Sequence, residues 1–222
     1  MESEWRSDSF SRDGTDEDRG NGNIIIGPKD MKLAHALIDS SVNDGTGSHS
    51  KFLRQIMVSV DIEAPLYLWK ELDQYKIGTV TDSESTMHRL AKTPITPDCF
   101  EMTDFSDGLE IPIYDLVGNQ IGTKTLDSEF ARDEIAGFLE QLRAAYNTTK
   151  DKRYWKELIR WLPEGWLQKR KWTANYQVVR NIYNDRVFHV HKLNDWAIFG
   201  KWISALPYSK DLIQYGFKEK NG

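Results

Sequence analysis

The sequence has a single cysteine, Cys99, and no long apolar run. One cysteine cannot form an internal disulfide and has no second thiol with which to hold zinc. His189 and His191 lack a clear third ligand, so we predict no metal site. No stretch approaches the roughly 18 apolar residues that cross a bilayer, and the polar N-terminus lacks the apolar core of a signal peptide. These absences predict a cytoplasmic protein without membrane contact.

Several nucleotide-binding and catalytic motifs are also missing. The sequence contains no Gly-x-Gly-x-x-Gly or Walker pattern, which argues against a Rossmann or P-loop site. Ser85 has no visible His/Asp relay, so hydrolase chemistry is not expected. The net charge of −5 argues against general nucleic-acid binding.

Charge is unevenly distributed along the chain. Residues 1–22 have a net charge of −4, whereas residues 150–192 have a net charge of +7. An anionic ligand would be attracted to the second segment. The alternative interpretation is a solvated helical face, because lysines often extend into water from such a surface.

The composition predicts one globular domain preceded by a tail. Hydrophobic residues make up 39% of the chain, and eight Trp, nine Tyr and nine Phe are present, which is enough for a sizeable core. Residues 1–22 contain almost nothing apolar, so burial there cannot offset the entropy of ordering. We therefore predict a disordered acidic tail over residues 1–22 and a single domain over residues 23–222.

Strand signals come first in the sequence. Two β-branched runs predict strands at residues 23–26 and 56–62. Asp30 is expected to cap a helix that ends near Ser41, and Ala64-Pro65 should close the second strand and start a helix over residues 66–75.

Helix signals dominate the later part. The segment from Thr79 to Ser85 is interpreted as a polar loop and a candidate for chemistry. Residues 91–124 are expected to be loop with a small hairpin near residues 111–123. Apolar residues at helical spacing predict helices at residues 126–146, 152–161 and 193–206. Strands followed by helices imply an α+β fold.

Residues 169–187 have the most informative pattern. In a single helix turning about 100° per residue, an apolar stripe would contain Trp172, Tyr176, Val179 and Tyr183. A second, polar row would contain Gln177, Asn181 and Asn184. Such a row suits a ligand wall, because asparagine is a poor helix former and an amide loses water when partly buried. The alternative is a core helix with some exposed amides.

Two blocks resemble the flavin-dependent thymidylate synthases. In the first, His49 is followed by the run from Ile56 to Ile62, then by Ala64-Pro65 and a helix. The second block contains Leu162-Pro163, Trp172-Thr173, Asn175, Asn181 and Arg186. The resemblance covers about residues 45–90 and 155–206.

The resemblance implies a small antiparallel sheet packed with long helices, in a homotetramer that binds FAD and dUMP where several subunits meet. It implies methylation of dUMP to dTMP that uses a folate one-carbon donor and reduced flavin, with NADPH and methylenetetrahydrofolate as co-substrates. The resemblance also implies a role for individual residues. The cofactor-binding residues would be His49, Gln74, Lys76, Asn175, Gln177 and Asn181. The substrate-binding residues would be Thr79, Glu84, Arg89, Arg160 and Arg186, and the catalytic residues would be Asp82, Ser85 and Arg186.

Several positions depart from the family pattern. Ser85 and Arg89 match only if the loop is longer by one to three residues, and a family arginine beside Leu-Pro is displaced to Arg160. Gln74 and Lys76 stand where the family has arginines that hold flavin phosphates, and Gln177 stands where it has a flavin-side arginine. Two alternatives to the enzyme therefore stay open. One is a catalytically degenerate homologue that binds a nucleotide. The other is an interaction protein whose acidic tail and basic helices recruit a partner.

Overall fold

The computed structural model describes residues 10–11, 24–45, 47–101, 108–189 and 193–217. The chain divides into two units. The terminal unit comprises Met1–Ser59, Tyr75–Val80 and Thr173–Gly222, and the central unit comprises Val60–Gln74 and Thr81–Trp172. In the part of the chain that the structure describes, no helix is long and apolar enough to cross a membrane.

A three-stranded sheet has the order β3-β7-β4, formed by β3 (Met57–Pro65), β7 (Leu167–Asn175) and β4 (Val80–Ser83). The division between the two units falls within each of these strands. Side-chain pairs show that β3 and β7 are antiparallel. Ser59 bonds Thr173 at 2.9 Å, Asp61 pairs with Lys171 at 3.8 Å, and Glu63 is 3.7 Å from Lys169.

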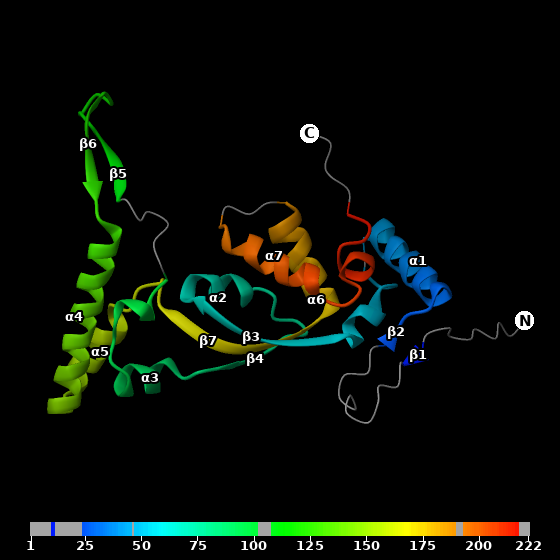
Figure 1. Ribbon diagram of the computed structural model, residues 1–222, viewed down its shortest axis with the longest axis horizontal. Coiled ribbons are helices and arrows are strands. Elements are labelled where there is room, and N and C mark those ends of the chain that lie inside the picture. The colour runs from blue at the N-terminus through cyan, green and yellow to red at the C-terminus, as the bar shows by residue number, and fades with distance from the viewer. Residues whose placement is uncertain (1–9, 12–23, 46, 102–107, 190–192, 218–222) are drawn as a thin grey trace, which may run out of the picture. The chain divides into compact units, whose positions relative to one another are not determined.

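The terminal unit packs its helices around α6 (Tyr176–Ile182). That helix contacts η2 (Lys51–Gln55), the π-helix η4 (Tyr183–Phe188) and η5 (Ser209–Ile213). Helix α7 (Asp195–Ala205) contacts η4 and η5, and α1 (Pro28–Asp44) contacts η5 (Figure 1). Fully buried apolar side chains fill this unit, including Ile38, Leu53, Val179, Ile182, Trp196, Ile203 and Ile213.

The central unit is built on the long helix α4 (Ser128–Thr149), which contacts α5 (Lys152–Arg160), α3 (Thr86–Lys92) and η3 (Pro97–Cys99). An antiparallel hairpin of β5 (Leu109–Tyr114) and β6 (Gln120–Leu126) precedes α4 (Figure 1). Helix α2 (Leu66–Leu72) follows β3. The core contains Leu90, Ile95, Cys99, Phe100, Ala136, Leu139, Leu158 and Trp166.

Most predicted elements are present, and the α+β class is confirmed. The strand before Ala64-Pro65, the hairpin and the helices α4, α5 and α7 lie where the patterns place them. Several helix ends differ, and α1 continues to Asp44, past the predicted end near Ser41. Helix α1 begins at Pro28 with Gly27 as its N-cap, because proline suits the first turn, and Asp30 lies in the first turn instead of capping it. Helix α2 ends at Leu72, three residues before the predicted end.

The prediction of one helix over residues 169–187 is wrong. Residues up to Asn175 belong to β7, only Tyr176–Ile182 is α-helical, and a π-helix follows. The helical spacing of Trp172 and Tyr176 spans the end of a strand and the start of a helix, and both side chains are buried. Strand β7 lies between β3 and β4, so sheet hydrogen bonding overrides the local pattern.

The predicted loop over residues 79–85 is also different, because Val80–Ser83 forms β4. Every residue of β4 is exposed, so the strand has no apolar alternation from which it could be recognised. The predicted disordered tail lies outside the described residues except at β1 (Phe10–Ser11), which pairs with β2 (Ile24–Ile25).

Candidate functional site

Asn175 joins the start of α6 to a tight turn. Its side chain is buried, and its Oδ1 accepts a hydrogen bond from the Val178 N–H at 3.1 Å, which caps the helix. Its Nδ2 donates to the Gly78 carbonyl at 3.5 Å. Gly78 has φ +83°, and a Cβ there would lie 2.5 Å from Nδ2 of Asn175. Glycine at residue 78 is therefore required both by the backbone and by the amide beside it.

A cavity of about 280 Å³ lies beside α6 in the terminal unit. Its wall combines residues from α1, the turn before η2, the segment after α2, α6, η4 and the C-terminal turns. The polar side chains of this wall are those of Ser41, Ser50, Tyr75, Gln177, Arg180, Asn181, Asn184 and Asp185. We call this space the α6 cavity.

The predicted polar row forms one side of the α6 cavity. Gln177, Asn181 and Asn184 all line it. The Ser50 hydroxyl donates to Oε1 of Gln177 at 3.1 Å, and Nε2 of Gln177 donates to Oδ1 of Asn181 at 3.0 Å. The Ser50 backbone N–H donates to the Ser41 hydroxyl at 2.7 Å. This relay fixes the orientation of the amides, so the wall presents donors and acceptors in set positions.

Tyr75 links the cavity wall to Arg186. Nε of Arg186 donates to the Tyr75 hydroxyl at 3.3 Å, and that hydroxyl donates to Oδ2 of Asp185 at 3.3 Å. Burial raises the pKa of Tyr75, and the hydrogen bond from Arg186 partly opposes this. The Arg186 guanidinium also lies 5.6 Å from the Trp196 ring centroid. Arg186 is thus held by an aromatic ring and a phenol, on the π-helix η4.

Arg180 is a wall residue that the sequence analysis missed. It is 5% exposed, its Nη1 donates to the Ile213 carbonyl at 2.8 Å, and its guanidinium lies 4.2 Å from the Phe217 ring centroid. Burial lowers the pKa of Arg180 to about 10, although the charge of Asp39 opposes this. A usable signal was present, since an arginine between Val179 and Ile182 interrupts the apolar side of α6.

The other predicted residues of the terminal unit lie outside the wall of the α6 cavity. His49 is exposed in the turn before η2, and Lys76 is exposed after α2. The Thr79 hydroxyl donates to the carbonyls of Tyr75 and Lys76 at 3.0 and 3.3 Å. Thr79 therefore closes the turn that carries Tyr75, which is a structural task.

A second cavity, of about 460 Å³, lies on the sheet face of the central unit. Asp82 and Glu84 line it together with Asp61, Glu63 and the basic residues 169–171. Opposite charges alternate across this face, so it suits a polar ligand that carries both donors and acceptors.

Four further predicted residues of the central unit have local partners or exposed positions. The Ser85 hydroxyl caps α3 by accepting from the His88 N–H at 3.4 Å. Nη1 of Arg89 donates to the Leu167 carbonyl at 3.1 Å. Arg160 forms an ion pair with Glu157 along α5, and Gln74 is exposed in the turn after α2.

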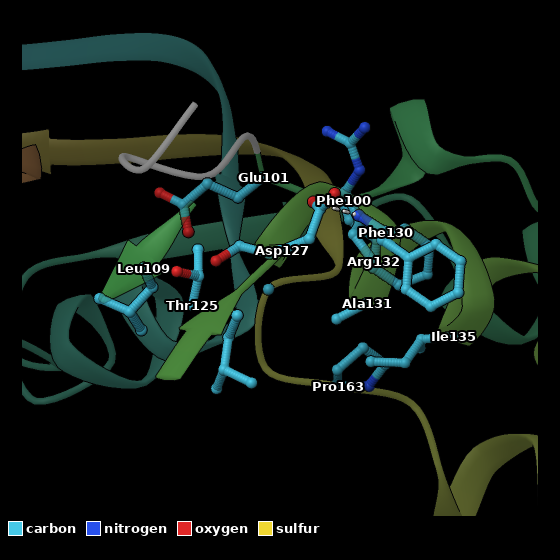
Figure 2. A pocket seen from close by; sticks show the side chains of 13 residues that line it. Phe100, Glu101, Leu109, Thr125, Asp127, Phe130, Ala131, Arg132, Ile135 and Pro163 are labelled. Carbon is cyan, nitrogen blue, oxygen red and sulfur yellow. Dashed lines mark hydrogen bonds between the residues drawn. The ribbon is translucent and has the colours of Figure 1, made fainter. Parts of the chain in front are cut away.

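A third cavity, of about 510 Å³, is mainly apolar and lies beside the hairpin and α4. Figure 2 shows Phe130, Ile135 and Pro163 on one side of it and Glu101, Thr125 and Asp127 on the other. The residues that line this cavity include none of the predicted site residues.

Comparisons with known proteins identify the fold. No protein-family model matches the sequence, and no curated protein matches it. A solved flavin-dependent thymidylate synthase from Helicobacter pylori, complexed with FAD and dUMP, is 18% identical, with 86% of this chain and 85% of that chain covered and a TM-score of 0.54. A second structure of the Helicobacter pylori enzyme with FAD and dUMP is 17% identical over 85% of this chain and 83% of that chain, with a TM-score of 0.53. The chain therefore has the flavin-dependent thymidylate synthase fold.

Proposed function

We propose that the protein binds FAD and dUMP and methylates dUMP to dTMP, with a folate as the one-carbon donor and reduced flavin as the source of the hydride. The observation that carries this proposal is the α6 cavity. The hydrogen-bonded amides of Gln177 and Asn181 line it. Tyr75 also lines it and accepts a hydrogen bond from Arg186. The fold of the solved thymidylate synthases supports it. NADPH and methylenetetrahydrofolate are the proposed co-substrates, and the cytoplasm is the proposed location.

The donor set of the α6 cavity fits a flavin or a pyrimidine. Gln177 and Asn181 offer amide groups, which match the alternating carbonyl and N–H groups of both rings. The cavity volume of about 280 Å³ lies just below the roughly 300–1,000 Å³ of typical small-molecule sites. One protomer would thus hold only part of a dinucleotide. This supports the proposed homotetramer, in which neighbouring subunits complete the site.

When bound, the reduced flavin would supply the hydride, and the residues of this chain would bind and orient. Asn175, Gln177 and Asn181 would hold the cofactor, and His49 would approach it from the turn before η2. Arg186 would pair with dUMP through its planar fork, while Tyr75 holds the guanidinium in place through the bond at 3.3 Å.

The charged face of the central unit provides the remaining proposed substrate contacts. Asp82 and Glu84 line a cavity there, so their carboxylates would polarise or orient the pyrimidine. Ser85, Arg89 and Arg160 are kept as proposed contacts, although each has a structural partner. Thr79 acts by closing the turn that carries Tyr75.

Arg186→Ala tests the substrate part of the proposal. The variant should weaken dUMP binding by about 1–3 kcal/mol, because a hydrogen bond to a charged group is lost. Binding is measured by titration calorimetry, and Arg153→Ala serves as the comparison, because Arg153 is an exposed residue of α5 that pairs with Asp151 and has no proposed contact with dUMP. The visible absorption spectrum of the purified protein tests the cofactor part. A colourless protein that does not bind added FAD, and whose melting temperature dUMP leaves unchanged, would refute the proposal.

A second candidate is a homologue that binds a nucleotide without catalysis. The observation that favours it is that Gln74 and Lys76, which replace the family's arginines, are exposed side chains outside the wall of the α6 cavity. A shift in melting temperature with dUMP, together with no flavin binding, would select this candidate over the enzyme.

A further inference from the structure

The Arg180 side chain is enclosed, and only part of its hydrogen-bonding capacity is used. The residue is 5% exposed, and Nη1 bonds the Ile213 carbonyl at 2.8 Å. Nη2 is buried and has no hydrogen-bond partner among the described residues. The hydrogen bond to the Ile213 carbonyl explains why Nη1 is buried, but it gives no reason for the burial of Nη2.

The charge of Arg180 is only partly balanced. Asp39 is the carboxylate that favours the protonated guanidinium, but burial outweighs it and lowers the pKa of Arg180 to about 10. The Oδ2 atom of Asp39 accepts a hydrogen bond from the Tyr215 hydroxyl at 3.1 Å. An enclosed charge is destabilising unless it is paired and hydrogen-bonded. An anion beside Nη2 would remove that cost.

Arg180 belongs to the wall of the α6 cavity, one helical turn after Gln177. Residues three apart on a helix are neighbours on its surface, so the guanidinium and the amide relay serve the same space. Phe217 lines this cavity too, and its ring lies 4.2 Å from the guanidinium carbon. Phe217 therefore packs against the guanidinium within the wall of this cavity.

We propose that Arg180 is the anion-binding residue of the α6 cavity and pairs with a phosphate group of the bound nucleotide. The identity of that nucleotide rests on the proposed function, whereas the anion site itself does not. The phosphate belongs either to the flavin dinucleotide or to the pyrimidine nucleotide. Both sources share the chemistry that a buried guanidinium recognises.

The test compares ligands that differ only in phosphate. Dissociation constants are measured by titration calorimetry for FAD against riboflavin and for dUMP against deoxyuridine. The main variant is Arg180→Gln, which keeps an N–H donor for the Ile213 carbonyl and removes the charge. Arg180→Met serves if that variant does not fold. The matched control is Arg143→Met, because Arg143 also contacts a backbone carbonyl, that of Ala91, but lies in the central unit.

The proposal expects one phosphate-bearing ligand to bind the Arg180 variant about 10- to 100-fold more weakly, with little change for its phosphate-free partner. The pair that shows this loss identifies the source of the phosphate. Arg143→Met should keep the wild-type affinities. If the Arg180 variants keep the wild-type preference for FAD over riboflavin and for dUMP over deoxyuridine, the proposal is overturned.

Inorganic pyrophosphate separates this inference from the proposed function. If the wild-type protein binds neither flavin nor dUMP, the proposed function fails, and the anion site is still tested by thermal melting. Pyrophosphate should raise the melting temperature of the wild-type protein and of Arg143→Met, and the rise should disappear in Arg180→Gln. An equal rise in all three proteins, or none in the wild type, would overturn the anion site.

Discussion

Replacing Gly78 with alanine should destabilise the terminal unit through two separable effects. Gly78 has φ +83°, and a Cβ there would lie 2.5 Å from Nδ2 of Asn175. The left-handed backbone costs an ordinary residue about 1–2 kcal/mol. The contact with the buried amide adds about 1–3 kcal/mol, as is usual when a packed site is overfilled.

A second substitution separates the two effects. Asn175→Ser keeps an oxygen that can cap α6 but removes Nδ2, the atom that the new Cβ would meet. The double variant Gly78→Ala/Asn175→Ser should therefore be more stable than the sum of the single losses predicts, by about 1–3 kcal/mol. Gly45→Ala is the matched control, because Gly45 has φ +65° in the same unit with nothing within 4 Å of an added Cβ.

Urea unfolding followed by tryptophan fluorescence measures all four variants against the wild type. Gly45→Ala should show the backbone cost alone, and Gly78→Ala should lose clearly more. Two results would refute the claim that the Asn175 side chain lies close to the turn at Gly78. One is an equal loss of stability in Gly78→Ala and Gly45→Ala, and the other is simple additivity of the losses at Gly78 and Asn175.

Two further predictions concern packing and pH. The hydrogen bonds from Arg143 hold the pKa of Glu140 below its usual value of 4.5, so the pair contributes stability above that pH and loses it as the pH falls through the lowered pKa. Glu140→Gln should therefore cost about 1 kcal/mol at neutral pH, and urea titrations in acid should show the difference from the wild type shrinking; a pH-independent difference would contradict this. Gly200→Ala should lower the melting temperature, because its Cβ would lie 2.6 Å from Cγ1 of Val187, and Val187→Ala should restore part of the loss; an unchanged melting temperature would show that α7 and η4 are not in close contact.

Local patterns predicted the helices well but failed where the sheet decides. The helix α4 and the hairpin before it carry their own signals, in apolar spacing and turn residues. Strand β7 has a misleading sequence pattern, because its buried Trp172 lies four residues before the buried Tyr176, which is a helical spacing. Strand β4 carried none, since all its residues are exposed. Both strands form because they pair with segments that are distant in the sequence, and the spacing of residues within one segment does not reveal such pairing.

The wall of the candidate site was predicted in part for a similar reason. Gln177, Asn181 and Asn184 line one cavity, as the predicted amide row suggested, because all three residues follow the point where strand β7 ends and the helix begins. Arg180 was missed, because it belongs to the apolar side of α6 and meets the cavity only through the fold of the C-terminal turns. Ser85 was chosen because it resembles the closing serine of the family pattern, and in the structure its hydroxyl caps a helix.

The π-helix η4 makes the spacing of residues along this segment as important as their identity. A π-turn holds more residues than an α-turn, and such turns often arise at functional sites. Deleting one residue between Tyr183 and Arg186 would remove the residue that widens this turn and would bring Arg186 one position closer to α6 along the chain. The arginine would then lose its phenol partner with no change in its chemistry. Single-residue insertions and deletions here should thus be more damaging than most point substitutions.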